Sequence, residues 1–298
     1  MAPPTFSTLV SGYSFFEGPR WHADRLWLSD FYTRQVIAVG LDGTVETIAE
    51  VPGQPSGLGW LPDGRLLVVS MRDRKLLRRE PDGRLVEHAD LSAVADGHAN
   101  DMVVDHAGNA YVGNFGFDLM GGAPFAPARL ARVAPDGTVS AVAEGLYFPN
   151  GSMVTPDGRT LIVGETFGNR LSAFDLLPGG GLGPRRDWAV FGPLPQGDNL
   201  AQVIAQTQVA PDGAALDAEG AVWLADANHR RVLRVAEGGR VLGEIATRPL
   251  GVYACALGGP DGRTLFLCVA PDYLEHKHKA AREAAVWTTR VDVPAAGF

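Results

Sequence analysis

The chain has 298 residues, of which 46% are hydrophobic and 8% aromatic, enough for one or two packed domains. Its formal net charge of −8, from 34 acidic and 26 basic side chains, disfavours a nucleic-acid partner, whose phosphates would be repelled. No segment reaches the roughly 18–20 apolar residues of a membrane span, and the start MAPPTFSTLV lacks the regions of a signal peptide. We therefore expect a cytoplasmic protein without a membrane partner.

One pattern recurs along the chain: a polar residue, a short apolar strand, a turn and a second apolar strand. The first copy is EGPRWHADRLW, with Glu17 at the polar position and Arg25 in the turn. In the later copies a glycine stands in the turn, and the residues eight positions before it are Ser56, Asn100, Asn150, Asp212 and Ala254. Successive copies start 39, 44, 50, 62 and 42 residues apart, and periods of roughly 40–50 residues are typical of propeller blades. Because six copies use the whole length, we predict a single domain over residues 1–298.

Each copy predicts a sheet of four antiparallel strands. In the second copy these are GLGWL (57–61), RLLVVS (65–70), KLLRRE (75–80) and LVEHADL (85–91), and PDG turns join the outer and the inner pairs. The last strand, VWTTRVDV (286–293), needs an outer neighbour, which TFSTLVSGY (5–13) can supply. The sequence therefore predicts an all-β fold, a six-bladed β-propeller closed by its N-terminal strand.

Three insertions interrupt the repeat, at residues 115–128, 192–210 and 271–285. Long loops in a compact domain are more often functional than idle, so we expect all three at the ligand-binding end.

Two cysteines, Cys255 and Cys268, are symmetric about the turn at 261–262 and could face each other across a hairpin. Two alternatives stay open: a pair of small buried residues in a reducing compartment, or a disulfide.

The polar positions of the repeat predict a metal site. Arranged around an axis, Glu17, Asn100, Asn150 and Asp212 would meet at its centre. Two carboxylates and two carboxamides offer only oxygen ligands, which favours Ca²⁺, with Mg²⁺, Mn²⁺ or Zn²⁺ as alternatives. Such a site leaves coordination places for water and substrate. The alternative is that these residues only cap turns.

Several motifs also resemble a known family. EGPRW, the ND of HAND, FPNG with TPDGRTLIV, and PDGAALDAEGAVWLAD resemble the SMP-30/gluconolactonase/luciferin-regenerating enzyme family over essentially the whole chain. The resemblance implies a six-bladed propeller with one divalent metal on its axis and lactone hydrolysis. It implies Glu17, Asn150 and Asp212 as metal ligands, Asn100 as the residue that binds substrate or a metal-bound water, and Asp212 also as the general base.

The chain departs from the sugar-lactone members at two positions near the matched asparagine. Where those members have arginine and glycine, this chain has His98 and Met102. His98 could donate a hydrogen bond or transfer protons, or be an inert loop residue. We predict a pocket less suited to sugars, in which substrate contacts Asn100, His98, Met102, Phe31, Phe115 and Tyr147, and in which Asp212, Asn100 and His98 are catalytic.

The sequence thus predicts a metal-dependent hydrolase that opens a cyclic ester less hydroxylated than a sugar lactone. The cation would polarise the carbonyl and hold the Asp212 pKa low, and either Asp212 or a metal-bound hydroxide would deliver water. Two alternatives remain: a metal-dependent lyase, isomerase or cyclase acting on a hydrophobic small molecule, or a non-catalytic ligand-binding propeller with a structural ion. The partner is a small-molecule substrate, and we expect a monomer or weak homo-oligomer.

Overall fold

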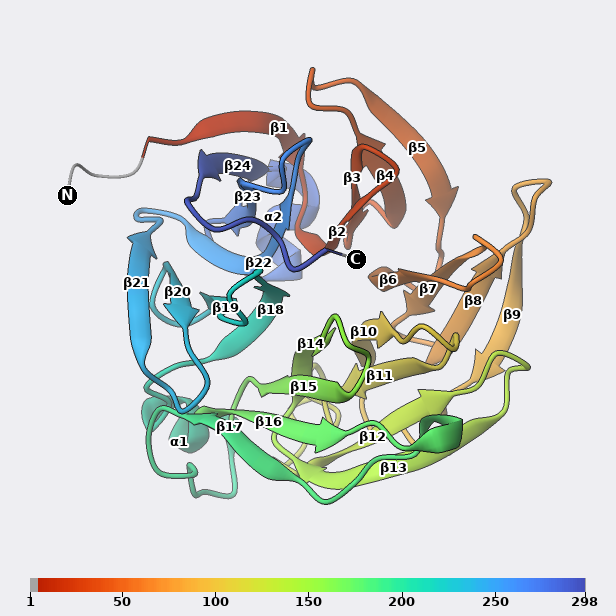
Figure 1. The fold of residues 1–298 in the computed structure, drawn as a ribbon, viewed down its shortest axis with the longest axis vertical. Helices are drawn as coiled ribbons and strands as arrows, with labels where there is room; N and C mark the ends of the chain where they lie inside the picture. Colours follow the sequence, from red (N-terminus) through yellow and green to blue (C-terminus); the bar gives the residue numbers. More distant parts are fainter. Residues whose placement is uncertain (1–4, 298) are drawn as a thin grey trace.

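The structure, a computed structural model, describes residues 5–297. These residues form six sheets of four antiparallel strands, which stand around a central channel like the blades of a propeller (Figure 1). The first strand of each blade contacts the first strands of its neighbours, so these six inner strands surround the channel. The predicted all-β, six-bladed propeller is confirmed.

In every blade the first strand lies at the channel and the fourth lies outermost. In blade 6 the outermost strand is the N-terminal β1. Blades 1 to 3 are β2 Phe16–His22, β3 Arg25–Asp30, β4 Gln35–Val39, β5 Val45–Glu50; β6 Pro55–Trp60, β7 Leu66–Ser70, β8 Lys75–Arg79, β9 Leu85–Asp90; β10 Ala99–Val104, β11 Ala110–Asn114, β12 Ala128–Val133, β13 Val139–Leu146. Blades 4 to 6 are β14 Pro149–Val154, β15 Thr160–Glu165, β16 Arg170–Asp175, β17 Arg186–Val190; β18 Pro211–Leu216, β19 Val222–Asp226, β20 Arg231–Val235, β21 Val241–Ala246; β22 Gly251–Gly258, β23 Thr264–Ala270, β24 Ala284–Arg290 and β1 Ser7–Tyr13. Outside the sheets lie η1 Pro178–Gly180, α1 Leu200–Ala205 and α2 Glu275–Ala281.

The N-terminal strand closes the ring, as predicted. β1 pairs antiparallel with β24 and completes blade 6, so both termini contribute to one sheet. The rings of Phe6 and Trp287 stack there with centroids 5.1 Å apart. This pairing satisfies the edge of β24, which would otherwise expose its backbone donors and acceptors.

Every inner strand carries a β-bulge at the same place, just after its second residue. The register shifts lie between Glu17 and Arg20, Pro55 and Leu58, Ala99 and Met102, Asn150 and Met153, Pro211 and Ala214, and Val252 and Ala254. A bulge places an extra residue on one strand and redirects the side chains beside it. The repeated polar position is therefore the second residue of each inner strand.

The register of blade 6 differs from the prediction. Gly251 pairs with Ala270 as Ala99 pairs with Asn114 in blade 3, so Val252 occupies the place of Asn100. Counting eight residues back from the turn glycine assigns that place to Ala254, because the hairpin between β22 and β23 is longer than its counterparts.

Glycine follows the polar position in most blades, because the inner strands pack very closely. A Cβ on Gly57 would lie 2.4 Å from the backbone nitrogen of Met102 in the next blade. On Gly151, whose φ is +46°, it would lie 2.1 Å from the carbonyl oxygen of Asp212. A side chain at either position would separate two blades.

The cysteines do not face each other. Cys268 stands opposite Ala254, and Cys255 stands opposite Leu267, so their side chains point to opposite faces of the sheet. Both thiols are free and buried. The disulfide alternative is wrong, and the two residues pack as small apolar side chains.

Among residues 5–297, neither helix has the length and apolar character needed to cross a bilayer.

Candidate functional site

A cavity of about 320 Å³ opens at the end of the channel where the inner strands begin. All three insertions contribute to its walls: Leu119 and Met120, then Leu200 and Ile204 on α1, then Tyr273 and Leu274 before α2. The prediction that the insertions lie at the ligand-binding end is therefore supported by this cavity, which we call the site cavity.

The four polar residues predicted to meet on the axis all line the site cavity, and all are buried. They are Glu17, Asn100, Asn150 and Asp212, each the second residue of an inner strand. The Asn150 amide nitrogen donates to Asp212 Oδ1 at 2.5 Å, and the Ser56 hydroxyl donates to Asn100 Oδ1 at 3.1 Å. Register alone therefore located this cluster.

The two carboxyl groups of the cluster are strongly perturbed. Burial raises the pKa of Glu17 well above its usual value, and the charges of Asp212 and Asp101 raise it further. Burial, followed by the charge of Asp101, raises the pKa of Asp212 to about 8. Both groups thus lack positive charge sufficient to stabilise their ionised forms.

The donor set fits a hard divalent cation. Two buried carboxylates would be stabilised by a cation between them, and carboxamide oxygens complete an all-oxygen set of the kind that Ca²⁺ and Mg²⁺ prefer. Among residues 5–297, no group of three or more His, Cys, Asp or Glu side chains could hold an ion. A cation held here would therefore depend on the carboxamides. The Asn150 oxygen accepts a hydrogen bond from the Gly151 N–H at 2.9 Å and keeps a second lone pair.

The remaining walls of the site cavity are mainly aromatic. The rings of Phe115 and Phe148 meet at 4.6 Å, and those of Phe15 and Tyr253 meet at 4.8 Å. Phe31 lines the cavity as predicted. Apart from the axial cluster, the polar groups on these walls belong to Thr166, Asn228 and the tyrosines Tyr32, Tyr253 and Tyr273.

The sequence analysis missed several wall residues that share one register. Residues just after the second strand of blades 1 to 5 reach the cavity. Phe31 and Phe115, which were predicted, stand at this position, and so do the missed residues Tyr32, Met71, Thr166, Phe167, Ala227 and Asn228. The same repeat that located the axial cluster could have found them, because five of the six blades place this position at the same end of the channel.

Three predicted substrate contacts lie elsewhere. The half-buried ring of His98 is 5.8 Å from that of Phe115 but does not line the cavity, and burial lowers its pKa, followed by the charge of Arg72. Tyr147 packs on Phe125 at 4.9 Å. Met102 is fully buried in the core between blades 2 and 3, because the bulge before it turns its side chain away from the axis.

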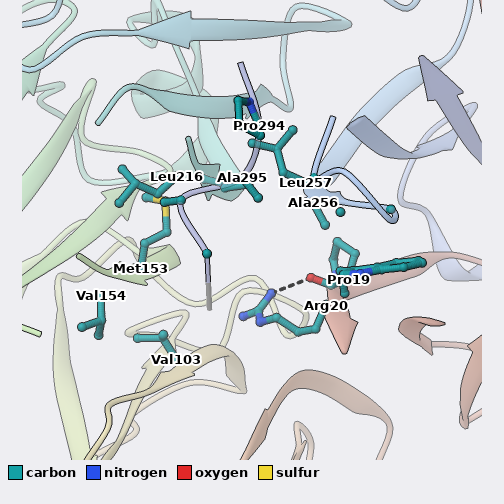
Figure 2. Close-up of a pocket in the computed structure, with 18 of the residues that line it drawn as sticks. Pro19, Arg20, Val103, Met153, Val154, Leu216, Ala256, Leu257, Pro294 and Ala295 are labelled. Carbon is teal, nitrogen blue, oxygen red and sulfur yellow. Dashed lines mark hydrogen bonds between the residues drawn. The ribbon is translucent and has the colours of Figure 1, made fainter. Parts of the chain in front are cut away.

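A second cavity, of about 370 Å³, lies at the opposite end of the channel, and we call it the far cavity (Figure 2). It is lined by later residues of the inner strands, among them Val103, Met153 and Leu216. The segment 294–297 enters it: the Ala295 N–H donates to the Gly262 carbonyl at 2.8 Å, and the Ala296 N–H donates to the Leu216 carbonyl at 3.0 Å. None of the four axial residues lines this cavity, so we place the functional site at the other end.

Comparisons with known proteins found relatives that match most of the chain. The chain is 27% identical over 256 residues to pentonolactonase XacC of Haloferax volcanii, which covers 85% of this chain and 81% of that protein. It is 28% identical over 264 residues to the 6-deoxy-6-sulfogluconolactonase of Pseudomonas putida, covering 85% and 82%. The crystal structure of regucalcin from Agrobacterium tumefaciens, described as a calcium-binding protein, superposes with a TM-score of 0.78 at 23% identity, covering 98% and 96%.

The profile of the SMP-30/Gluconolactonase/LRE-like region matches residues 15–271, which include the four axial residues and five complete blades. The chain therefore belongs to the SMP-30/gluconolactonase/LRE-like family.

Proposed function

We propose that this protein is a divalent-cation-dependent hydrolase that opens a lactone, with Glu17, Asn150 and Asp212 holding the cation. One observation carries the proposal: oxygen-bearing side chains from four blades line a single buried cavity. The names of two relatives, a pentonolactonase and a sulfogluconolactonase, support the reaction. The regucalcin structure, described as a calcium-binding protein, supports Ca²⁺ as the ion.

The bound cation supplies a Lewis acid for the lactone carbonyl. We assign Asp212 the role of accepting the proton of the attacking water, since its carboxylate lies at the cavity wall. Asn100 accepts a hydrogen bond from Ser56 through its oxygen, so its amide nitrogen is the donor that we assign to a substrate oxygen. His98, which lies outside the cavity wall, receives no role in the reaction.

The walls of the site cavity favour a lactone with few hydroxyl groups. Phenylalanine, leucine and methionine side chains offer no hydrogen bonds, so each hydroxyl group brought against them would lose its water partners. An unpaired buried polar group costs about 1–3 kcal/mol. A lactone with an alkyl or phenyl substituent would instead gain from the burial of its apolar surface.

The test compares kcat/KM for gluconolactone with that for a δ-lactone carrying an alkyl or phenyl substituent, before and after EDTA treatment. We expect a preference of about tenfold or more for the apolar lactone, and turnover lost with EDTA and restored by Ca²⁺, Mg²⁺, Mn²⁺ or Zn²⁺. A tenfold preference for gluconolactone would refute the substrate class but leave the cation site intact.

The mass of the product distinguishes hydrolysis from the alternative reactions. Hydrolysis adds one water molecule to the substrate, whereas a lyase or cyclase product does not contain it. A product with the mass of the substrate would therefore refute hydrolysis, and no turnover on any lactone, with a bound ion, would favour a ligand-binding propeller.

A further inference from the structure

Arg20 crosses the channel beneath the site cavity. It stands on β2, three residues after Glu17, and lines the far cavity, where Figure 2 shows its side chain among the residues of other blades. One of its terminal nitrogens donates to Asp101 Oδ1 at 2.9 Å and to the Met102 carbonyl at 2.5 Å, both on β10 of blade 3. The other donates to the Pro19 carbonyl at 2.9 Å. The guanidinium thus joins blade 1 to blade 3.

Its partner Asp101 occupies an unusual place. It is the third residue of its inner strand, where blades 1, 2, 4 and 5 have Gly18, Gly57, Gly151 and Gly213. The Asp101 side chain is buried, and it directly follows Asn100. Blade 3 therefore brings a third carboxylate close to those of Glu17 and Asp212.

The charge of Asp101 acts on the axial cluster. Its carboxylate interacts electrostatically with both Glu17 and Asp212, and the Arg20 guanidinium pairs with it at 2.9 Å. When all three carboxylates are ionised, as they would be around a cation, they and one guanidinium carry a charge of −2, which a divalent cation balances. Without Arg20 the same cluster would carry −3.

We propose that Arg20 is a positioning residue that neutralises Asp101, fixes the backbone of β10 beside Asn100, and so sets the charge that the site cavity offers to a divalent cation. The inference rests on the proposed function, because it concerns the affinity of the same cation site. Arginine suits this place since its planar fork donates to a carboxylate and a carbonyl together, which a lysine ammonium does less well.

The experiment is a double-mutant cycle of Arg20→Gln, Asp101→Asn and the double variant, with Ca²⁺ affinity measured by titration calorimetry. Arg20→Gln makes the cluster more negative and should tighten Ca²⁺ binding, whereas Asp101→Asn should weaken it, each by about tenfold. The double variant should return to within about threefold of the wild type, since the two charges cancel. Arg20→Lys, which keeps the charge, should also stay within about threefold.

A second measurement, thermal unfolding of the metal-free variants, does not depend on the cation. Arg20→Gln leaves a buried carboxylate unpaired, so it should lower Tm more than the double variant does. Arg25→Gln is the matched control, because the partner of that arginine, Glu46, is exposed on the same blade. Its Ca²⁺ affinity should equal that of the wild type.

The outcomes separate the two proposals. If the wild type binds Ca²⁺ but the two single variants shift its affinity in the same direction, or not at all, the role of Arg20 is refuted and the proposed function stands. If the wild type binds none of the four divalent ions, the cation dependence of the proposed function is refuted. The assignment of Arg20 is then refuted as well.

Discussion

At the scale of single residues, most of the proposed chemistry depends on Asp212. It lines the site cavity, is buried, and accepts a hydrogen bond from Asn150. The same side chain is proposed to hold the cation and to accept the proton of the attacking water. Replacing Asp212 should therefore weaken cation binding and lower turnover together.

We expect Asp212→Asn to lower kcat/KM for the preferred lactone by about 10²–10⁴, since it removes a proton acceptor and a charged ligand. Calorimetry should show weaker Ca²⁺ binding in the same variant. Asp187→Asn, at an exposed position on an outer strand, is the matched control and should behave like the wild type. Full activity or unchanged metal content in Asp212→Asn would contradict the assignment.

Asp212 should also make the stability of the metal-free protein depend on pH. Its pKa rises from 3.8 to about 8 on folding, because burial and Asp101 disfavour the ionised form. Between these values the folded state binds more protons than the unfolded state, so the free energy of unfolding falls as pH rises. This loss of stability should be complete above about pH 8, where Asp212 is ionised in both the folded and the unfolded state.

The measurement is Tm of the EDTA-treated protein across this pH range, beside Asp212→Asn, which should show a shallower decline. Added Ca²⁺ should raise Tm most at high pH, where the carboxylate is free to bind it. A Tm that rises with pH in the wild type relative to Asp212→Asn would refute this prediction.

At the scale of strands and loops, the sequence predicted what the repeat controls and missed what a bulge changes. The axial residues share a register and a chemistry, so their convergence followed from spacing. The orientation of the Met102 side chain did not follow from spacing. One extra residue in β10 turns this side chain from the axis into the core between blades 2 and 3. The length of the β22–β23 hairpin likewise shifted blade 6 by two positions, which a turn glycine alone could not reveal.

The loops are where sequence reasoning was weakest. The lengths of the three insertions predicted their place at the cavity, but not which of their side chains reach it. Residues 192–210 contain α1, a helix of six residues, which has too few turns to produce a clear periodic pattern. Contacts of this kind depend on how the loop folds back onto the blades, not on local spacing.

α1 provides a prediction about specificity. Leu200 and Ile204, four residues apart on one face of this helix, line the site cavity. Truncating either to alanine removes apolar contact worth about 1–2 kcal/mol, so KM for the apolar lactone should rise by about 5- to 30-fold. Gluconolactone should be affected less.

Steady-state kinetics with both lactones checks this, and Ala205→Ser, at an exposed position of α1, serves as the control. Equal losses for both lactones in Leu200→Ala and Ile204→Ala would indicate that α1 only supports the fold. Unchanged kinetics would show that substrate does not reach this wall.

At the scale of the whole molecule, the ring is closed by the pairing of β1 with β24, whose residues are separated by most of the chain. The inner strands contact each other all the way around the channel, so each blade depends on two neighbours. The axial cluster is assembled from four blades and has its geometry only while the ring is closed. Closure therefore links the stability of the fold to the site.

We propose that residues 1–298 unfold as one cooperative unit, and that weakening the closure lowers the stability of the entire ring. Phe6→Ala removes the ring that stacks on Trp287 and should lower the free energy of unfolding by about 1–2 kcal/mol. Urea unfolding followed by tryptophan fluorescence and by circular dichroism should show one transition, at a lower midpoint and with an unchanged slope. Ca²⁺ should move this midpoint upward, because the proposed ligands Glu17, Asn150 and Asp212 come from three blades that meet only in the folded ring. Two separate transitions, or a Phe6→Ala variant that loses blade 6 while the Ca²⁺ site stays intact, would show that the blades are not one unit.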